Sequence, residues 1–128
     1  MFHYFLLTYS VENVGDQSVE RIAKAVRDGI AALTIEDVKA TSDTISYAVD
    51  GWEKLPNVET AISGEFYFSG DNDESDLTKK DFAKNIIRIL FRKILSSKNA
   101  TSYTTVIHCA LLIGGADRAF TFKVSPRT

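Results

Sequence analysis

Four basic residues recur at intervals of four in the second half of the sequence, and they form its clearest candidate binding site. They are Lys80, Lys84, Arg88 and Arg92. Residues four apart on an α-helix lie one above another, so these charges form a basic stripe on one face. Phe91 falls at the edge of the stripe on the helical wheel. Cations beside an aromatic ring suit RNA or single-stranded DNA, because phosphates pair with the cations and nucleobases stack on the ring.

The basic stripe is also compatible with two other kinds of acidic contact. One is an acidic protein partner or a dimer contact. The other is the chain itself, because residues 36–76 hold eleven acidic and two basic side chains, whereas residues 77–98 hold seven basic and one acidic. These counts correspond to net charges of −9 and +6. Each like-charged pair at a spacing of four costs about 0.2–0.5 kcal/mol, so we expect an anionic group beside the stripe.

The other reactive residues do not form a catalytic or metal-binding pattern. The acidic run 71–76 lacks the glycine and the final glutamate of a calcium loop, which predicts a solvated loop. His3 and His108 can come close in an antiparallel sheet, but two imidazoles without a third ligand make a poor zinc site. Cys109 is interpreted as a buried thiol, because its side chain points away from the face of His108. We therefore expect no catalytic residue, metal or cofactor, and an enzyme is the minority interpretation.

Hydrophobic periodicity predicts two helices and five strands. The first helix is expected over about 17–33, with Asp16 as its N-cap. The second is expected from Thr78 to about Leu95, opened by a capping box of Thr78 and Asp81. No element is assigned to residues 51–62, where Pro56 argues against a central strand. The strands are expected over 2–9, 44–49, 62–69, 103–112 and 119–124.

This order predicts one α+β domain over residues 1–128. Its first six elements match the ferredoxin-like split βαβ arrangement, a mainly antiparallel sheet with two helices on one face, and a C-terminal strand is added. The first strand is apolar on both of its faces. A large apolar sheet face does not stay exposed in a soluble monomer. We therefore expect either the segment around Trp52 or a second copy of the chain to cover it, and we favour a homodimer.

The composition is that of a globular protein, with 45% hydrophobic and 25% charged residues among 128. It excludes a disordered chain, a collagen-like repeat and a disulfide scaffold. The single cysteine favours a reducing compartment. The apolar start of the chain lacks the basic region and the cleavage site of a signal peptide, and no apolar run reaches the length of a membrane span. These features predict a cytoplasmic protein that does not bind a membrane.

The run Leu7-Thr8-Tyr9-Ser10-Val11, an apolar strand that leads into a loop and a helix, resembles the first strand of the small CRISPR-associated and VapD-type ribonucleases. The resemblance covers about the first thirty residues. It implies a ferredoxin-like dimer. Those families end this strand with a metal-binding aspartate, where this chain has Ser10. The resemblance therefore implies a relative that binds RNA or protein without metal-dependent cleavage.

Taken together, these patterns predict a small, non-catalytic, homodimeric protein that acts through protein–protein contacts, as an inhibitor or accessory factor. The alternative is a protein that binds RNA or single-stranded DNA, or a nuclease relative. Both hypotheses place the contact on the same side chains of the second helix. These are Lys80, Lys84, Arg88, Phe91 and Arg92.

Overall fold

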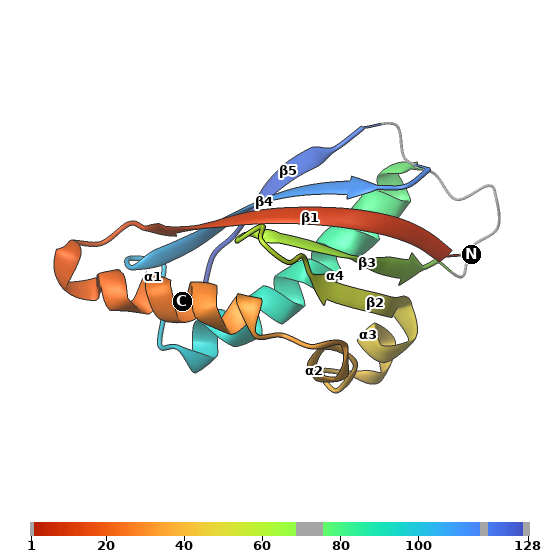
Figure 1. The fold of residues 1–128 in the computed structure, drawn as a ribbon. Coiled ribbons are helices and arrows are strands. Elements are labelled where there is room, and N and C mark those ends of the chain that lie inside the picture. The colour runs from red at the N-terminus through yellow and green to blue at the C-terminus, as the bar shows by residue number, and fades with distance from the viewer. Residues whose placement is uncertain (1, 69–75, 116–117, 127–128) are drawn as a thin grey trace.

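The chain forms an α+β structure in which helices lie against one face of an open, antiparallel five-stranded sheet (Figure 1). The computed structural model describes residues 2–68, 76–115 and 118–126. The sheet order is β2-β3-β1-β4-β5. The strands are β1 (Phe2–Asn13), β2 (Val49–Lys54), β3 (Ala61–Tyr67), β4 (Thr105–Ile113) and β5 (Phe120–Val124). The helices are α1 (Glu20–Ala31), α2 (Ile35–Lys39), α3 (Asp43–Ala48) and α4 (Asp76–Ser97).

The longest strand, β1, is the middle strand of the sheet. It pairs antiparallel with β3 from Phe2 to Thr8 and with β4 from Phe5 to Asn13. It therefore extends beyond the predicted end at residue 9. The extension matters because it brings the polar residues after Tyr9 into the sheet rather than into a loop.

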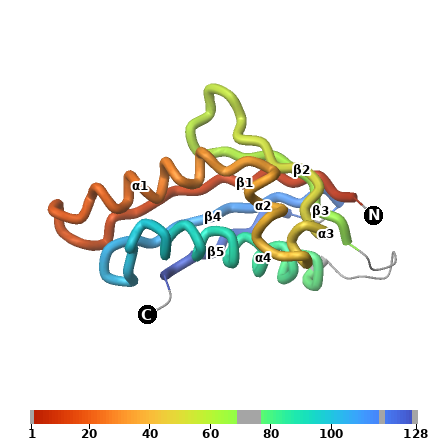
Figure 2. Tube along the Cα trace, turned by 90° about the horizontal axis from the view of Figure 1, so that it is seen from below, coloured from red at the N-terminus to blue at the C-terminus, as the bar shows by residue number. Residues whose placement is uncertain are grey.

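All four helices lie on one side of the sheet, which is seen from that side in Figure 2. Helix α1 buries Ala23, Val26 and Ile30, which recur at helical spacing. Asp16 accepts a hydrogen bond from the Ser18 backbone N–H, so the predicted cap is confirmed, although the first turn is a 3₁₀ helix. Within the part of the chain that the structure describes, no helix combines the length and the apolar content that a membrane crossing needs.

Two predicted elements are wrong in detail. The strand expected over 44–49 is helix α3, because the Ser42 hydroxyl caps the backbone N–H of Ile45 and starts a helical turn. Strand β2 begins only at Val49 and runs through the unassigned segment. Helix α4 begins at Asp76, so Thr78 lies inside the helix and the predicted capping box is wrong.

The core lies between the helices and the face of the sheet that they cover. The ring of Phe5 stacks on Phe66, with centroids 4.3 Å apart, and lies 5.9 Å from the ring of Trp52. Trp52 is only 6% exposed and belongs to this covered side. The expectation that the Trp52 segment covers the other face is therefore wrong. None of the helices that the structure describes lies on the other face, which we call the open face (Figures 1 and 2).

Candidate functional site

The basic stripe lies on the side of α4 that is next to β5 and the residues after it. The Lys80 ammonium is 5.7 Å from the centroid of the Phe120 ring. The Arg92 Nε donates a hydrogen bond to the Ser125 carbonyl oxygen over 3.2 Å. Lys84 pairs with Asp81, one turn earlier on the same helix, at 3.9 Å. Three of the four cations therefore have partners within the chain.

Arg88 and Phe91 lie deeper than the sequence indicated. The Arg88 Nε is buried and has no hydrogen-bond partner among the described residues. The Phe91 ring is fully buried and meets Tyr9 edge to face at 6.1 Å. The predicted place of Phe91 at an exposed edge is wrong, because α4 packs against both the sheet and α1 and buries a wider arc than one face. A buried ring does not stack on a nucleobase, so the aromatic part of the predicted nucleic-acid site is absent.

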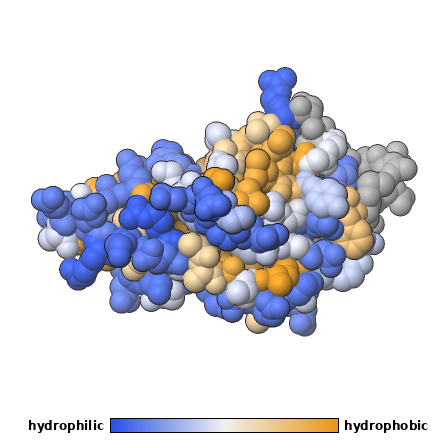
Figure 3. All heavy atoms as spheres, in the orientation of Figure 1, coloured by the Kyte–Doolittle hydropathy of each residue, from blue (hydrophilic) through white to orange (hydrophobic). Residues whose placement is uncertain are grey.

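The open face instead carries a group of exposed apolar side chains. Tyr4 is 74% exposed and Leu6 is 40% exposed. Leu6 lies directly opposite Leu112 of β4. The Phe2 and Tyr67 rings are 5.1 Å apart at the end of the same face. Figure 3 shows hydrophobic residues gathered over β1 and β4. We call this group the apolar end: Phe2, Tyr4, Leu6, Tyr67 and Leu112.

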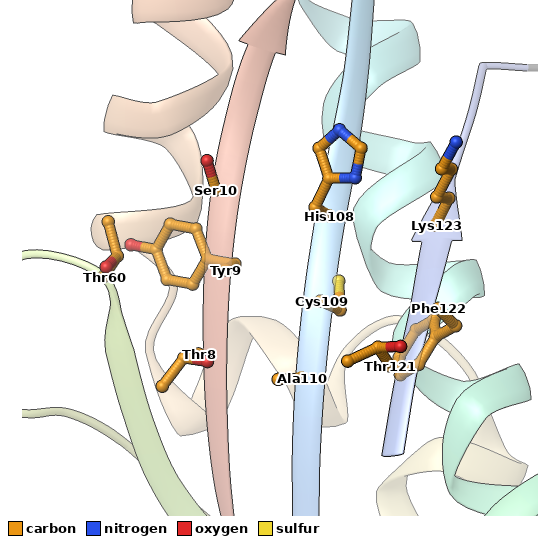
Figure 4. A pocket seen from close by; sticks show the side chains of 10 residues that line it. All are labelled: Thr8, Tyr9, Ser10, Thr60, His108, Cys109, Ala110, Thr121, Phe122 and Lys123. Atoms are coloured by element: carbon orange, nitrogen blue, oxygen red, sulfur yellow. The ribbon is translucent and has the colours of Figure 1, made fainter.

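The same face becomes polar toward the other end of β1. Ser10, His108 and Lys123 are register partners on β1, β4 and β5, and they stand side by side in Figure 4. The His108 Nε2 lies 2.8 Å from a carboxylate oxygen of Glu12. Both side chains of this pair are about half exposed. We call this group the polar end: Ser10, Glu12, His108 and Lys123.

A hollow of about 630 Å³ lies at the polar end. Its walls include the side chains of Thr8, Ser10 and His108 and, from β5, Thr121 and Lys123 (Figure 4). Hydroxyl groups, the His108 imidazole and the Lys123 ammonium therefore face solvent over a shallow basin. This surface offers hydrogen-bond donors to a docked molecule.

The candidate nucleophiles beside the hollow are not activated. Burial raises the pKa of the Cys109 thiol to about 12, so the thiol stays protonated. Burial is also the main cause that raises the pKa of Tyr9, whose hydroxyl donates to the Glu59 carbonyl oxygen. The prediction that Cys109 is buried is confirmed.

The two histidines lie far apart. Register pairs His108 with Ser10, seven residues along β1 from His3. His3 instead packs against the Phe68 ring, and its Nδ1 is 2.6 Å from the Gly114 carbonyl oxygen. The idea that the histidines meet is wrong, because the partner of His3 is set by a register that the sequence does not display.

Metal binding finds no support in the described residues, among which no three histidine, cysteine or carboxylate side chains are grouped to hold an ion. Residues 71–75 of the predicted acidic loop lie outside the described residues. No protein-family model, curated protein or solved structure matches the chain in the three comparisons.

Sequence reasoning placed the candidate site residues on α4. It predicted an apolar sheet face without helices but named no site residue on that open face. The residues of the open face can be located from β1, because every second residue of a strand lies on the same face. Along β1 these residues change from apolar to polar in the order Tyr4, Leu6, Thr8, Ser10, Glu12. Ending the strand at residue 9 hid the second half of this pattern. His108 lies on this face because β4 pairs with β1, and Lys123 lies on it because β5 pairs with β4.

Proposed function

We propose that this protein is a non-catalytic binding protein that acts through protein–protein contacts, and that its open face docks a second copy of the chain. The observation that carries the proposal is the apolar end of the open face. Side chains such as Tyr4, Leu6 and Leu112 are exposed there on adjacent strands of a sheet whose other face is filled by helices. Contiguous apolar surface of this kind is typical of an interface.

The dimensions of the sheet support a contact of this kind. Five strands spaced about 4.8 Å apart, with pairings of about seven residues, form a face on the order of 600 Å² before side chains roughen it. Stable interfaces bury roughly 800 Å² on each partner. Two sheets stacked face to face pack about 10 Å apart and exclude water from the side chains between them. A contact with a second copy would therefore have to use the whole open face, the apolar end included.

The charges on the open face favour a protein over a nucleic acid. Glu65 is the register partner of Tyr4, and Glu53 lies on the next strand beside Ser63. These carboxylates repel phosphates at the place where the exposed rings would stack on bases. On α4, three cations of the basic stripe have partners within the chain, and Phe91 is buried. The nucleic-acid hypothesis thereby loses its two main supports.

The strand order and the antiparallel pairing also support a ferredoxin-like arrangement for β1 to β4, which β5 extends at one edge. A dimer formed through the open face keeps the helices on its outside. The outer side of the helices then remains accessible to a further protein partner. This arrangement fits an inhibitor or an accessory factor.

The dimer is tested by sedimentation velocity over a wide range of protein concentration. Leu6→Lys and Leu112→Lys place a charge in the apolar end, and each is expected to shift the protein to a monomer without changing its circular dichroism spectrum. The matched control is Ile89→Lys, because Ile89 is 50% exposed on α4, outside the open face. A wild-type protein that stays monomeric at every concentration, or a folded Leu6→Lys variant that dimerises as before, rejects the proposal.

Nucleic-acid binding is tested separately by fluorescence anisotropy with short RNA and single-stranded DNA at two salt concentrations. We expect no salt-sensitive binding. Binding that falls steeply with salt, and that is lost in a Lys84→Ala, Arg88→Ala, Arg92→Ala variant, would instead support the alternative function.

A further inference from the structure

We infer that the protein binds a phosphate group in a hollow at the C-terminal end of α4. The hollow measures about 350 Å³, near the lower end of the range for ligand sites. Arg92 and Ser96 of α4 line it, together with Asn99 and Thr101 of the turn that follows the helix and Pro126 beyond β5. The inference goes beyond the proposed function, because none of these residues belongs to the open face.

Arg92 supplies the positive charge of the hollow. Its Nε donates to the Ser125 carbonyl oxygen over 3.2 Å, which ties the side chain to the segment after β5. Its two terminal Nη groups have no hydrogen-bond partner among the described residues. A guanidinium that is held at Nε keeps its outer N–H groups for two oxygens of one ligand. This bidentate contact is the one that arginine makes with phosphates and carboxylates.

The other walls supply neutral hydrogen-bond donors. Ser96 follows Arg92 by four residues, so the two lie on one face of α4. Asn99 has a left-handed backbone, with φ at 61°, and it ends the helix there. The chain turns at this residue and brings Thr101 to the same hollow as Ser96. A serine hydroxyl, an asparagine amide and a threonine hydroxyl therefore surround the guanidinium from two segments.

The turn after α4 is held by its own hydrogen bonds. The Thr101 backbone N–H donates to the Thr104 hydroxyl oxygen over 2.9 Å. The Thr101 carbonyl oxygen accepts from the backbone N–H groups of Thr104 and Thr105, over 3.0 and 3.1 Å. Thr101 is therefore in place without a ligand, and the loop pays no ordering cost on binding.

The surroundings of the hollow favour an anion. Residues 82–116 contain five lysine and arginine residues and no aspartate or glutamate. Among the described residues, no carboxylate side chain lines the hollow.

The end of a helix normally disfavours an anion, because its last carbonyl oxygens are unpaired. Here the carbonyl oxygens of Ile94, Leu95 and Ser96 each accept a backbone N–H from the turn, over 3.1, 2.9 and 3.1 Å. The full charge of the Arg92 guanidinium therefore outweighs the partial charges at the end of α4.

The set of donors favours a phosphate over a carboxylate. A carboxylate has two oxygens in one plane, and the Arg92 guanidinium alone satisfies them. A phosphate monoester has three free oxygens and a charge of about −1.5 to −2 at pH 7, so it also engages the hydroxyl and amide donors. The phosphate of a small molecule and that of a phosphorylated side chain share this chemistry, and the probes below distinguish the two sources.

Binding is tested by titration of the backbone amide resonances at constant ionic strength. The probes are inorganic phosphate, glucose 6-phosphate and a peptide with one phosphoserine. We expect saturable shifts at residues 96–101, and the tighter of the two phosphate esters identifies the source. Acetate is expected to bind about tenfold more weakly than phosphate, and equal affinity would overturn the choice of phosphate. The absence of a saturable shift with all three phosphates rejects the site.

Two pairs of variants locate the site. Arg92→Gln is expected to weaken phosphate binding about tenfold or more, because it removes the charged donor. Lys93→Gln is the matched control, because it removes the same charge from the next residue, whose side chain does not line the hollow. Equal affinities of the two variants would contradict the inference.

The second pair leaves the contact between Arg92 and Ser125 in place. Ser96→Asp puts a carboxylate into the hollow at an exposed position and is expected to abolish phosphate binding. Ser97→Asp adds the same charge one residue along, outside these walls, and is expected to retain most of the affinity. Circular dichroism checks that all variants are folded. A folded Ser96→Asp variant that binds phosphate as well as Ser97→Asp rejects the site.

The outcomes are separate from those for the dimer. Helix α4 lies on the helical side of the sheet, away from the open face (Figure 2). The Leu6→Lys variant is therefore expected to bind phosphate with wild-type affinity, whether or not the wild type dimerises. Loss of phosphate binding in Leu6→Lys would show that the site needs the open face and would contradict the inference. Failure of phosphate binding in every variant leaves the test of the dimer as it stands.

Discussion

The two faces of β1 are similar in the sequence and very different in the structure. Leu6 and Leu7 are neighbours of the same residue type, yet Leu7 is fully buried and Leu6 is 40% exposed. On the covered side, Phe5 stacks on Phe66 beneath the helices. On the open side, Tyr4 remains 74% exposed. The comparison teaches that the described helices cover one face only, so the apolar residues of the other face lie outside the core.

The largest effect is expected from a pair of matched truncations. Leu7→Ala removes a fully buried side chain and is expected to lower the free energy of unfolding by about 2–5 kcal/mol. Leu6→Ala removes a side chain that stays in contact with solvent and is expected to cost less than about 1 kcal/mol. Urea unfolding of both variants at the same low protein concentration measures the difference. Equal losses would contradict the assignment of the two faces.

A glycine on the covered side sharpens the comparison further. A Cβ added at Gly64 would collide with the Gly51 carbonyl oxygen and lie 2.6 Å from the Phe5 ring. Gly64→Ala is therefore expected to destabilise the protein by about 1–3 kcal/mol, because the β2–β3 pairing must shift. Ser63→Ala, one residue away on the open side, is the control and is expected to be nearly neutral. Thermal unfolding that ranks them the other way would show that β3 presents the opposite faces.

The smallest effect concerns the buried thiol. The Cys109 pKa is raised to about 12, whereas an unfolded thiol ionises near pH 8.5. Between these values only the unfolded state loses its proton, so stability is lost as pH rises, with a limiting slope of about 1.4 kcal/mol per pH unit. Urea unfolding at pH 8 and pH 10 should therefore show a greater loss for wild type than for Cys109→Ala.

Thiol labelling checks the same contrast directly. The native thiol is expected to react with a disulfide reagent only on unfolding. Ala110→Cys, made in the Cys109→Ala variant, moves the thiol to the hollow on the open face and is expected to react quickly in the folded protein. Rapid labelling of native Cys109 would contradict its place on the covered side.

Much of the fold could be predicted because it depends on local patterns. The spacing of Val26 and Ile30 marks the buried side of α1, and Asp16 caps its first turn. The errors arose where one local pattern is compatible with both a strand and a helix. Residues 44–49 alternate like a strand, but the Ser42 cap and the i,i+3 pair of Ile45 and Ala48 make a helix.

The candidate site was less predictable because it depends on contacts between distant segments. The spacing of the basic stripe was visible, but its partners Phe120 and Ser125 lie more than thirty residues away along the chain. On a helical wheel with a single buried arc, Phe91 falls outside that arc, at the edge of the basic stripe. Its burial depends on the angle at which α4 lies against β1 and α1, and no local pattern contains that angle.

The sequence by itself determined the α+β class, most of the strands and helices, the helical spacing of the cations, and the burial of Cys109. Those properties follow from periodicity and from side-chain chemistry along one segment. Only the tertiary structure decided which face of β1 the helices cover, on which side Trp52 lies, and that Ser10, His108 and Lys123 form one row. A strand has two faces by geometry, and which one is buried depends on helices and partner strands that pair from far along the chain.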